Sequence, residues 1–287
     1  MLTDSPENRD QALQELPARS IAILGIPWDE KSSYLRGPAA APGSIRQALY
    51  SSSTNTSTES GSDLADEPRI RFLGDLDLEP GEAAFATIEA SVARVLGLGS
   101  RVLCLGGDHS VTLPIVRAHS RHFPGLSILH IDAHADLYDE LGGDRLSHAC
   151  PFSRIMEEGL VSRLVQLGVR TLNAHQREQA NRFGVQILEM RNWRPDDGLP
   201  EDLDGPLYLS LDLDALDPAF APGVSHPEPG GLSTRELLDI LQGLPTPLVG
   251  ADIVELNPLR DPRGLTARVA AKLLKEIAAR MLVDYTA

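Results

Sequence analysis

Short apolar runs recur along the chain, and Gly, Pro or charged residues bound most of them. A continuous apolar run of this length is typical of a strand that is buried on both faces, as in a parallel sheet. Longer stretches with helical periodicity separate the runs. The pattern predicts strands near residues 21–26, 69–76, 101–105, 126–131, 164–168, 185–189, 207–213 and 248–254.

The intervening stretches predict helices that alternate with these strands, near residues 42–50, 83–98, 111–122, 151–158, 174–182, 233–242 and 265–282. Such alternation predicts an α/β protein whose largely parallel sheet carries helices on both faces, although a (β/α)₈ barrel fits the same count. We expect one domain over residues 20–287, preceded by a frayed or surface-lying extension over residues 1–19. Residues 51–68 are rich in Ser, Thr, Asp and Glu and predict an exposed excursion.

Composition narrows the class of protein. Hydrophobic residues make up 42% of the 287 residues, which is enough for a large core. The net charge of −15 argues against a nucleic-acid or anionic-membrane partner, while it is compatible with a cationic substrate or simply with solubility. Two cysteines, no apolar N-terminal signal and no apolar run of roughly 20 residues predict a cytoplasmic protein without a membrane span.

Ligand-type side chains follow three of the predicted strands. The stretches are Gly-Gly-Asp-His-Ser at 106–110, Asp-Ala-His-Ala-Asp at 132–136 and Ser-Leu-Asp-Leu-Asp-Ala-Leu-Asp-Pro at 210–218. Alternate residues of an extended chain share a face, and sites in parallel sheets lie beyond the carboxyl ends of the strands. The candidate metal ligands are His109, Asp132, His134, Asp136, Asp212 and Asp214.

These six residues supply four carboxylates and two imidazoles, so two divalent cations would balance the negative charge. The donor set favours Mn²⁺ and also suits Fe²⁺, Co²⁺ or Ni²⁺, while the lack of Cys ligands argues against structural zinc. The alternative is a set of unrelated acidic strand ends. A calcium loop is excluded, because Asp217 and Gly223 occupy the positions that require Gly and Glu when counting starts at Asp212.

The three stretches, in this order, resemble the metal-binding signatures of the ureohydrolases, the family of arginase, agmatinase and their relatives. Residues 21–68, 147–159, 217–233 and 250–258 also look like that family, and like its plant-type arginase and agmatinase-like branch most of all. The resemblance implies a three-layer α/β/α fold with a mostly parallel eight-stranded sheet. It also implies assembly as a homotrimer or homohexamer and hydrolysis of a small guanidino compound.

The resemblance assigns roles to the ligands: His109 and Asp136 on one ion, His134 and Asp214 on the other, and Asp132 and Asp212 bridging both. It makes His148 the proton-transfer residue and Glu255 the carboxylate that anchors the guanidinium. For His148 the alternative is a histidine near a helix start at Pro151, and for Glu255 it is a surface acid at a strand end. A Cys150–His148 nucleophile is rejected, because the metal site already provides one.

These assignments agree with the chemistry that such a hydrolysis requires. Two cations lower the pKa of a bridging water from about 15.7 towards roughly 7 and so supply hydroxide for attack on the guanidinium carbon. Asp136 would orient that hydroxide, and Glu255 would fix the planar guanidinium. His148 would protonate the departing amine, which leaves with urea as the other product.

The segment after Asp136 is expected to select the substrate. Acidic groups at Asp139, Glu140 and Asp144 would repel a carboxylate if they face the pocket, and Asn173 stands where animal arginases have an acid near the substrate α-amino group. We therefore expect agmatine as the substrate, with arginine next and guanidine third. Asp139, Asp144 and Asn173 join His148 and Glu255 as candidate substrate contacts.

Two alternatives come from other classes of protein. A non-catalytic ureohydrolase-like regulatory subunit would typically lack metal ligands, yet all six are present here. An amide deacetylase of related fold uses a single zinc with a different ligand set, and the second strand end that carries a histidine argues against it. The metal content of the purified protein distinguishes both from a two-metal hydrolase.

Overall fold

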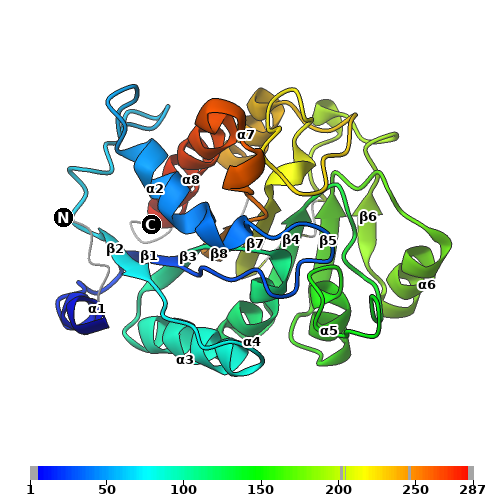
Figure 1. Ribbon diagram of the computed structural model, residues 1–287, viewed down its shortest axis with the longest axis horizontal. Helices are drawn as coiled ribbons and strands as arrows, with labels where there is room; N and C mark the ends of the chain where they lie inside the picture. Colours follow the sequence, from blue (N-terminus) through cyan, green and yellow to red (C-terminus); the bar gives the residue numbers. More distant parts are fainter. Residues whose placement is uncertain (1–5, 201–202, 204, 245–246, 284–287) are drawn as a thin grey trace.

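A single eight-stranded sheet with the order β2-β1-β3-β8-β7-β4-β5-β6 runs through the molecule, and every strand pairs with its neighbours in parallel. Figure 1 shows the computed structural model, which describes residues 6–200, 203, 205–244 and 247–283. The strands are β1 (Ile21–Gly25), β2 (Ile70–Asp75), β3 (Arg101–Leu105), β4 (Ser127–Ile131), β5 (Arg163–Leu167), β6 (Gln186–Leu188), β7 (Leu207–Asp212) and β8 (Leu248–Val254).

Helices cover both faces of the sheet and complete three layers. In Figure 1, α2, α7 and α8 lie above the sheet, and α3, α4 and α5 lie below it. The helices are α1 (Pro6–Gln14), α2 (Ala41–Leu49), α3 (Ala83–Gly97), α4 (Thr112–His122), α5 (Pro151–Glu157), α6 (Ala174–Phe183), α7 (Thr234–Gln242) and α8 (Leu265–Val283). The predicted three-layer α/β/α fold is therefore confirmed.

Alternation along each strand divides the apolar side chains between two cores. In β3, for example, Leu103 and Leu105 belong to one core, whereas Val102 and Cys104 belong to the other. All four side chains are fully buried, as a strand in a sheet covered on both faces requires. This explains why the strands read as continuous apolar runs rather than as alternating polar and apolar positions.

The sheet is open, which excludes the barrel alternative: β2 and β6 are its edges. The four central strands are β3, β8, β7 and β4, although β3 and β4 are consecutive in sequence. In the sheet, β8 and β7 lie between β3 and β4. The strand numbers therefore fall and then rise again across the middle of the sheet, so the order changes direction there. In open parallel sheets, a crevice at such a point beyond the carboxyl ends of the strands is where ligands bind.

Two segments are more ordered than the sequence indicates. Residues Pro6–Gln14 of the extension, which was expected to be frayed or surface-lying, form helix α1 at the surface, and Leu13 is buried; residues 1–5 lie outside the described part. The 51–68 segment is anchored to α8, since Lys275 Nζ donates to Asn55 O at 2.8 Å and Leu64 enters the core. Most of the segment is exposed, as its polar composition predicts, but Thr58 and Leu64 are buried.

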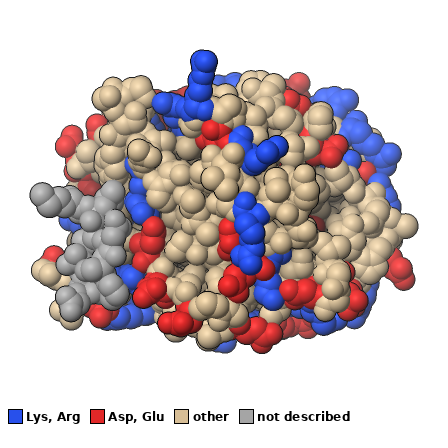
Figure 2. Space-filling view, in the orientation of Figure 1, with Lys and Arg blue, Asp and Glu red and all other residues tan. Residues whose placement is uncertain are grey.

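Charged side chains of both signs are distributed over the surface. On the face that Figure 2 shows, Lys and Arg side chains are interspersed with Asp and Glu side chains. Among the described residues, no helix is both long enough and apolar enough to cross a membrane.

Candidate active site

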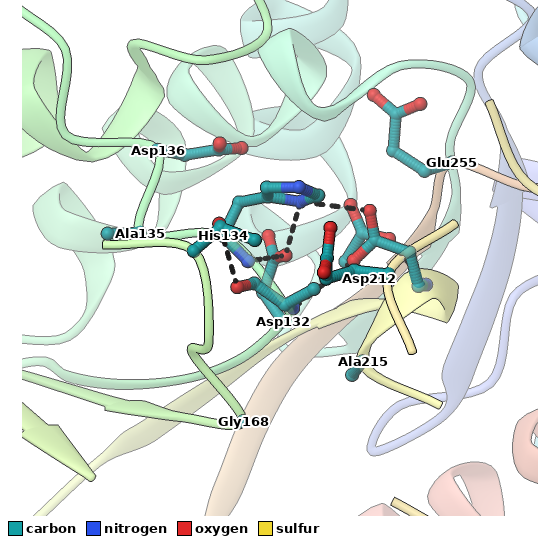
Figure 3. A network of polar contacts seen from close by, with 12 residues as sticks. Asp132, His134, Ala135, Asp136, Gly168, Asp212, Ala215 and Glu255 are labelled. Atoms are coloured by element: carbon teal, nitrogen blue, oxygen red, sulfur yellow. Dashed lines mark hydrogen bonds and ion pairs between the residues drawn. The ribbon is translucent and has the colours of Figure 1, made fainter. Parts of the chain in front are cut away.

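The four central strands deliver the predicted metal ligands and Glu255 to one end of the sheet. His109 begins a short 3₁₀ helix after the 106–108 turn that follows β3, and the 132–136 stretch follows β4. Asp212 is the last residue of β7, and Glu255 follows β8. Figure 3 shows Asp132, His134 and Asp212 converging, with Asp136 and Glu255 nearby. The structure therefore confirms that these strand ends lie close together.

One group of side chains surrounds His109. Its Nδ1 atom lies 3.1 Å from Asp136 Oδ2, 3.2 Å from Asp132 Oδ2 and 3.2 Å from Asp212 Oδ2. All of these side chains are buried, and Nδ1 nevertheless makes no hydrogen bond of normal geometry among the described residues. Three carboxylate oxygens around one such nitrogen form the donor set of a cation site.

A second group surrounds His134 and shares Asp132 with the first. His134 Nδ1 lies 3.0 Å from Asp214 Oδ2 and 3.4 Å from Asp132 Oδ1. The two oxygens of Asp132 therefore face different histidines. The two groups share Asp132, and the residues present fit divalent cations, since carboxylate and imidazole donors suit such ions.

The charges of this cluster also favour bound cations. Burial and the neighbouring carboxylates raise the pKa of Asp212, and burial together with Asp132 raises the pKa of Asp214 to about 6. Each shift means that the anionic form is disfavoured when no positive charge is close. Divalent cations would remove this penalty, so the electrostatics support the same conclusion as the geometry.

A buried polar chain supports His109 from behind. His109 Nε2 lies 3.0 Å from Ser210 Oγ, which donates to Asp252 Oδ1 at 2.8 Å. The other oxygen of Asp252 accepts hydrogen bonds from Tyr208 Oη at 2.7 Å and Thr112 Oγ1 at 2.9 Å. Partners of this kind fix the ring orientation of a metal-binding histidine. Sequence reasoning missed Asp252, although a lone carboxylate within the apolar β8 run was a usable signal.

His130 supports Asp132 in the same way and was also missed. Its Nε2 lies 2.8 Å from Asp132 Oδ2, its Nδ1 lies 2.9 Å from Gln166 Nε2, and its ring stacks on Phe152. It precedes Asp132 by two residues and therefore shares its face of β4. That spacing could have identified it. Since it is fully buried, we interpret it as a support for Asp132 rather than as part of the pocket wall.

The backbone is strained at two of the predicted catalytic residues. Asp136 has φ 47° and Glu255 has φ 65°, in the left-handed region that non-glycine residues rarely adopt. Such conformations persist only where the surroundings enforce them, and they are concentrated at functional sites. Here Glu255 N donates to Gly107 O at 2.8 Å, which ties the turn after β8 to the turn after β3.

His148 and Glu255 form a buried pair. His148 Nδ1 lies 2.7 Å from Glu255 Oε1, which also accepts a hydrogen bond from His109 N at 2.9 Å. Burial opposes protonation of His148, but the charge and hydrogen bond of Glu255 outweigh it and raise the pKa to about 9. Burial likewise disfavours ionised Glu255, yet His148 holds the pKa of that carboxyl below its usual value. The structure therefore favours a charged pair near neutral pH.

A pocket of about 240 Å³ opens onto this cluster. Its lining residues are Ser33, His134, Asp136, Tyr138, Leu141, His148, Ala149, Thr171, Gln176, Asp212, Asp214, His226 and Glu255. Six of the predicted site residues are thus in the pocket wall, while His109 and Asp132 are completely buried. No residue of the 51–68 segment belongs to this lining.

The predicted acidic substrate contacts lie outside the pocket lining. Asp139 Oδ1 accepts hydrogen bonds from Arg145 at 2.7 Å and from Arg154 at 2.8 Å. Asp144 Oδ2 pairs with Lys31 Nζ at 2.8 Å. Both carboxylates are therefore neutralised by cations of the same chain, which corrects the expectation that they repel a substrate carboxylate in the pocket.

Asn173 and Cys150 also have other roles in the structure. Asn173 caps α6, since its Oδ1 accepts from Gln176 N at 2.9 Å, and its Nδ2 donates to Tyr138 Oη at 2.7 Å. It therefore supports a pocket residue and does not line the pocket itself. Burial raises the pKa of Cys150 to about 12, in agreement with the rejection of a thiolate nucleophile.

His226 is a pocket residue that sequence reasoning did not single out. Its ring centre lies 5.2 Å from that of His148 and 6.1 Å from that of His134. It comes from the long connection between β7 and α7, where no periodicity relates it to the strand ends. Burial, with His148 nearby, lowers the pKa of His226, so it adds a neutral imidazole to the wall at neutral pH.

An open parallel sheet with a carboxylate–histidine cluster at its centre defines a metal-dependent hydrolase site. The sequence profile described as the arginase family matches residues 19–279. The chain is 47% identical over 277 residues to "Arginase 1, mitochondrial" of Arabidopsis thaliana, covering 91% of this chain and 81% of that protein. An agmatinase of Photorhabdus laumondii is 37% identical, with coverage of 89% and 85%.

A solved structure agrees with the sequence relatives. The arginase from Medicago truncatula superposes with a TM-score of 0.89 at 43% identity, over 96% of this chain and 93% of that one. The chain belongs to the arginase family. It is accordingly a hydrolase that acts on guanidino C–N bonds and releases urea. Enzymes of this family depend on two metal ions and bind small guanidino substrates.

Proposed function

We propose that this protein is an arginase, which hydrolyses L-arginine to L-ornithine and urea. The observation that carries the proposal is the similarity of the chain to plant arginases: these are 43–47% identical to it, whereas the agmatinases of Photorhabdus laumondii and Serratia proteamaculans are 36–37% identical. The proposed substrate is therefore L-arginine, the second expectation from the sequence, rather than agmatine, the first.

The pocket supports this choice of substrate. Asp139 and Asp144 would disfavour arginine only if they repelled its carboxylate in the pocket. Both are instead paired with cationic side chains outside the pocket lining. The lining instead includes the neutral polar side chains of Thr171 and Gln176. Hydroxyl and amide groups can donate hydrogen bonds to the α-carboxylate of arginine without charge repulsion.

Two divalent cations are part of the proposal, with Mn²⁺ preferred for a donor set rich in carboxylates. The residues that would hold them are His109, Asp132, His134, Asp136, Asp212 and Asp214. When bound, the cations would acidify a water molecule and so supply the nucleophile. We also keep a cytoplasmic location and assembly as a homotrimer or homohexamer as part of the proposal. Light scattering on the purified protein would test the assembly.

The side chains of the protein would perform the remaining steps. The Glu255 carboxylate would bind the planar guanidinium through charge-assisted hydrogen bonds and hold its carbon in place for attack. Asp136 would orient the attacking water by accepting its hydrogen bond. His148 would give its proton to the departing amine nitrogen as the C–N bond breaks. The raised pKa of His148 supports this role, because the proton is present at neutral pH.

The experiment is an assay of urea release by the purified, Mn²⁺-loaded protein with L-arginine, agmatine and guanidine as separate substrates. We expect kcat/KM for L-arginine to exceed that for agmatine by at least about tenfold, which corresponds to roughly 1.4 kcal/mol of transition-state discrimination. Asp132→Asn serves as the inactive control for contaminating activity. A preference for agmatine or guanidine would refute the proposal.

A further inference from the structure

The segment between β1 and α2 brings a serine to the proton-transfer pair. Asp108 Oδ2 accepts a hydrogen bond from Lys31 N at 2.9 Å, and Lys31 O accepts one from His148 N at 3.2 Å. Lys31 is thus bonded through its backbone to the turn after β3 and to the segment that carries His148. Ser33, two residues further along this segment, lies in the pocket wall.

Ser33 and Glu255 contact different ring nitrogens of His148. Ser33 Oγ lies 2.8 Å from Nε2, while Nδ1 lies 2.7 Å from Glu255 Oε1. The Glu255 carboxylate can only accept, so Nδ1 carries a proton in both charge states of the ring. Nε2 is therefore the nitrogen that gains and loses a proton.

A hydroxyl suits that nitrogen, because it can donate to bare Nε2 and accept from protonated Nε2. We infer that Ser33 is a positioning residue that holds Nε2 of His148 at the pocket wall for proton transfer to the departing amine. This inference rests on the proposed function of His148. In the step concerned, the Nε2–H bond breaks, the amine nitrogen gains the proton and keeps the electron pair of the C–N bond, and Ser33 Oγ then donates to neutral Nε2.

Kinetics of three variants test the inference. Ser33→Ala removes the hydroxyl, Ser33→Thr retains it, and Ser91→Ala is a control on α3, where the hydroxyl donates only to a helix carbonyl. With L-arginine and agmatine, we expect Ser33→Ala to lower kcat by about tenfold or more with KM within about twofold, since general-acid catalysis contributes at least that much. Ser33→Thr should restore most of kcat, and metal content should be equal in all variants.

An unchanged kcat in Ser33→Ala would overturn the inference. So would a raised KM with unchanged kcat, because Ser33 would then contact the substrate rather than act through His148. A loss of kcat that Ser33→Thr does not recover would also overturn it, since the hydroxyl would not be the group responsible.

A second measurement needs no turnover. Diethyl pyrocarbonate modifies accessible neutral histidines, and peptide mass mapping measures the rate at His148. Loss of the Ser33 hydroxyl should raise that rate several-fold in Ser33→Ala, while Ser33→Thr and Ser91→Ala should match the unchanged protein. If the unchanged protein released no urea from either substrate, the proposed function would fail, and an equal labelling rate in Ser33→Ala would separately overturn the role of Ser33.

Discussion

His148 Nδ1 lies 2.7 Å from Glu255 Oε1, and only 9% and 5% of the two side chains are exposed. The pair joins the loop before α5 to the end of β8, so it contributes to the fold as well as to the proposed chemistry. Because Glu255 raises the pKa of His148 to about 9, folding and protonation of this histidine are linked.

The pH dependence of stability should report this pair. A histidine whose pKa is raised on folding contributes stability fully below about pH 6.5, and the contribution is lost as the pH rises through about 9. In EDTA, we expect the free energy of unfolding to fall over this range by on the order of 2 kcal/mol more than in His148→Asn. Urea denaturation at several pH values measures it, and parallel curves for the two proteins would contradict the prediction.

Asp252→Asn should weaken metal binding without any direct contact to a metal. The substitution disturbs the Ser210 hydrogen bond that orients His109, and loss of such supporting partners costs about 10–100-fold in metal affinity. Competition with a fluorescent chelator measures the affinity for Mn²⁺. Tyr208→Phe is the matched control, because it removes the hydrogen bond that Tyr208 donates to Asp252 but leaves the Ser210 contact. Equal losses in both variants would exclude the proposed chain of contacts.

Gly107→Ala should destabilise the protein strongly. A Cβ atom at this position would lie 1.6 Å from the carbonyl oxygen of Trp28, and a backbone atom cannot move aside cheaply. We expect a loss of about 3 kcal/mol or more in urea denaturation. Gly43→Ala in α2 meets no atom within 4 Å and should instead gain up to about 1 kcal/mol from helix propensity. A similar change in both variants would refute the steric explanation.

Arg154→Met should destabilise the segment after β4 and raise KM for the substrate. Arg154 is 6% exposed, and its guanidinium donates to both the carbonyl and the carboxylate of Asp139. Its removal leaves these acceptors without their buried partner, at a cost of about 2–3 kcal/mol. Arg145→Met, at a side chain that is 49% exposed, should cost less than about 1 kcal/mol. If the two variants behaved alike, burial would not be the determining factor.

The strands could be predicted to within one or two residues, because strands buried on both faces are continuously apolar. The 101–105 run and β3 coincide, and the 248–254 run and β8 coincide. The strand order could not be predicted, since apolar runs do not encode which neighbours they pair with. Helix α1 was missed because its sequence is mostly polar and Leu13 provides little periodicity.

The ligand cluster was foreseeable because all six residues lie at or just beyond the carboxyl ends of three parallel strands, which meet at one edge of the sheet. Asp139 and Asp144 were judged wrongly as pocket charges, because their partners Arg154 and Lys31 come from other elements. Ser33 and His226 reach the pocket through loops whose paths depend on tertiary contacts. Local sequence carries no record of those contacts.

Because of the strand order, the metal centre can form only after the whole sheet has been synthesised. β8 and β7 lie between β3 and β4 in the sheet, although they are made last. A nascent chain that ends before Leu207 already contains His109 and Asp132 but lacks β7 and β8, which lie between β3 and β4, and with them Asp212 and Asp214. Such a chain cannot assemble the dinuclear centre. Metal uptake should therefore distinguish finished molecules from truncated ones, and prematurely terminated products should stay in the apo form.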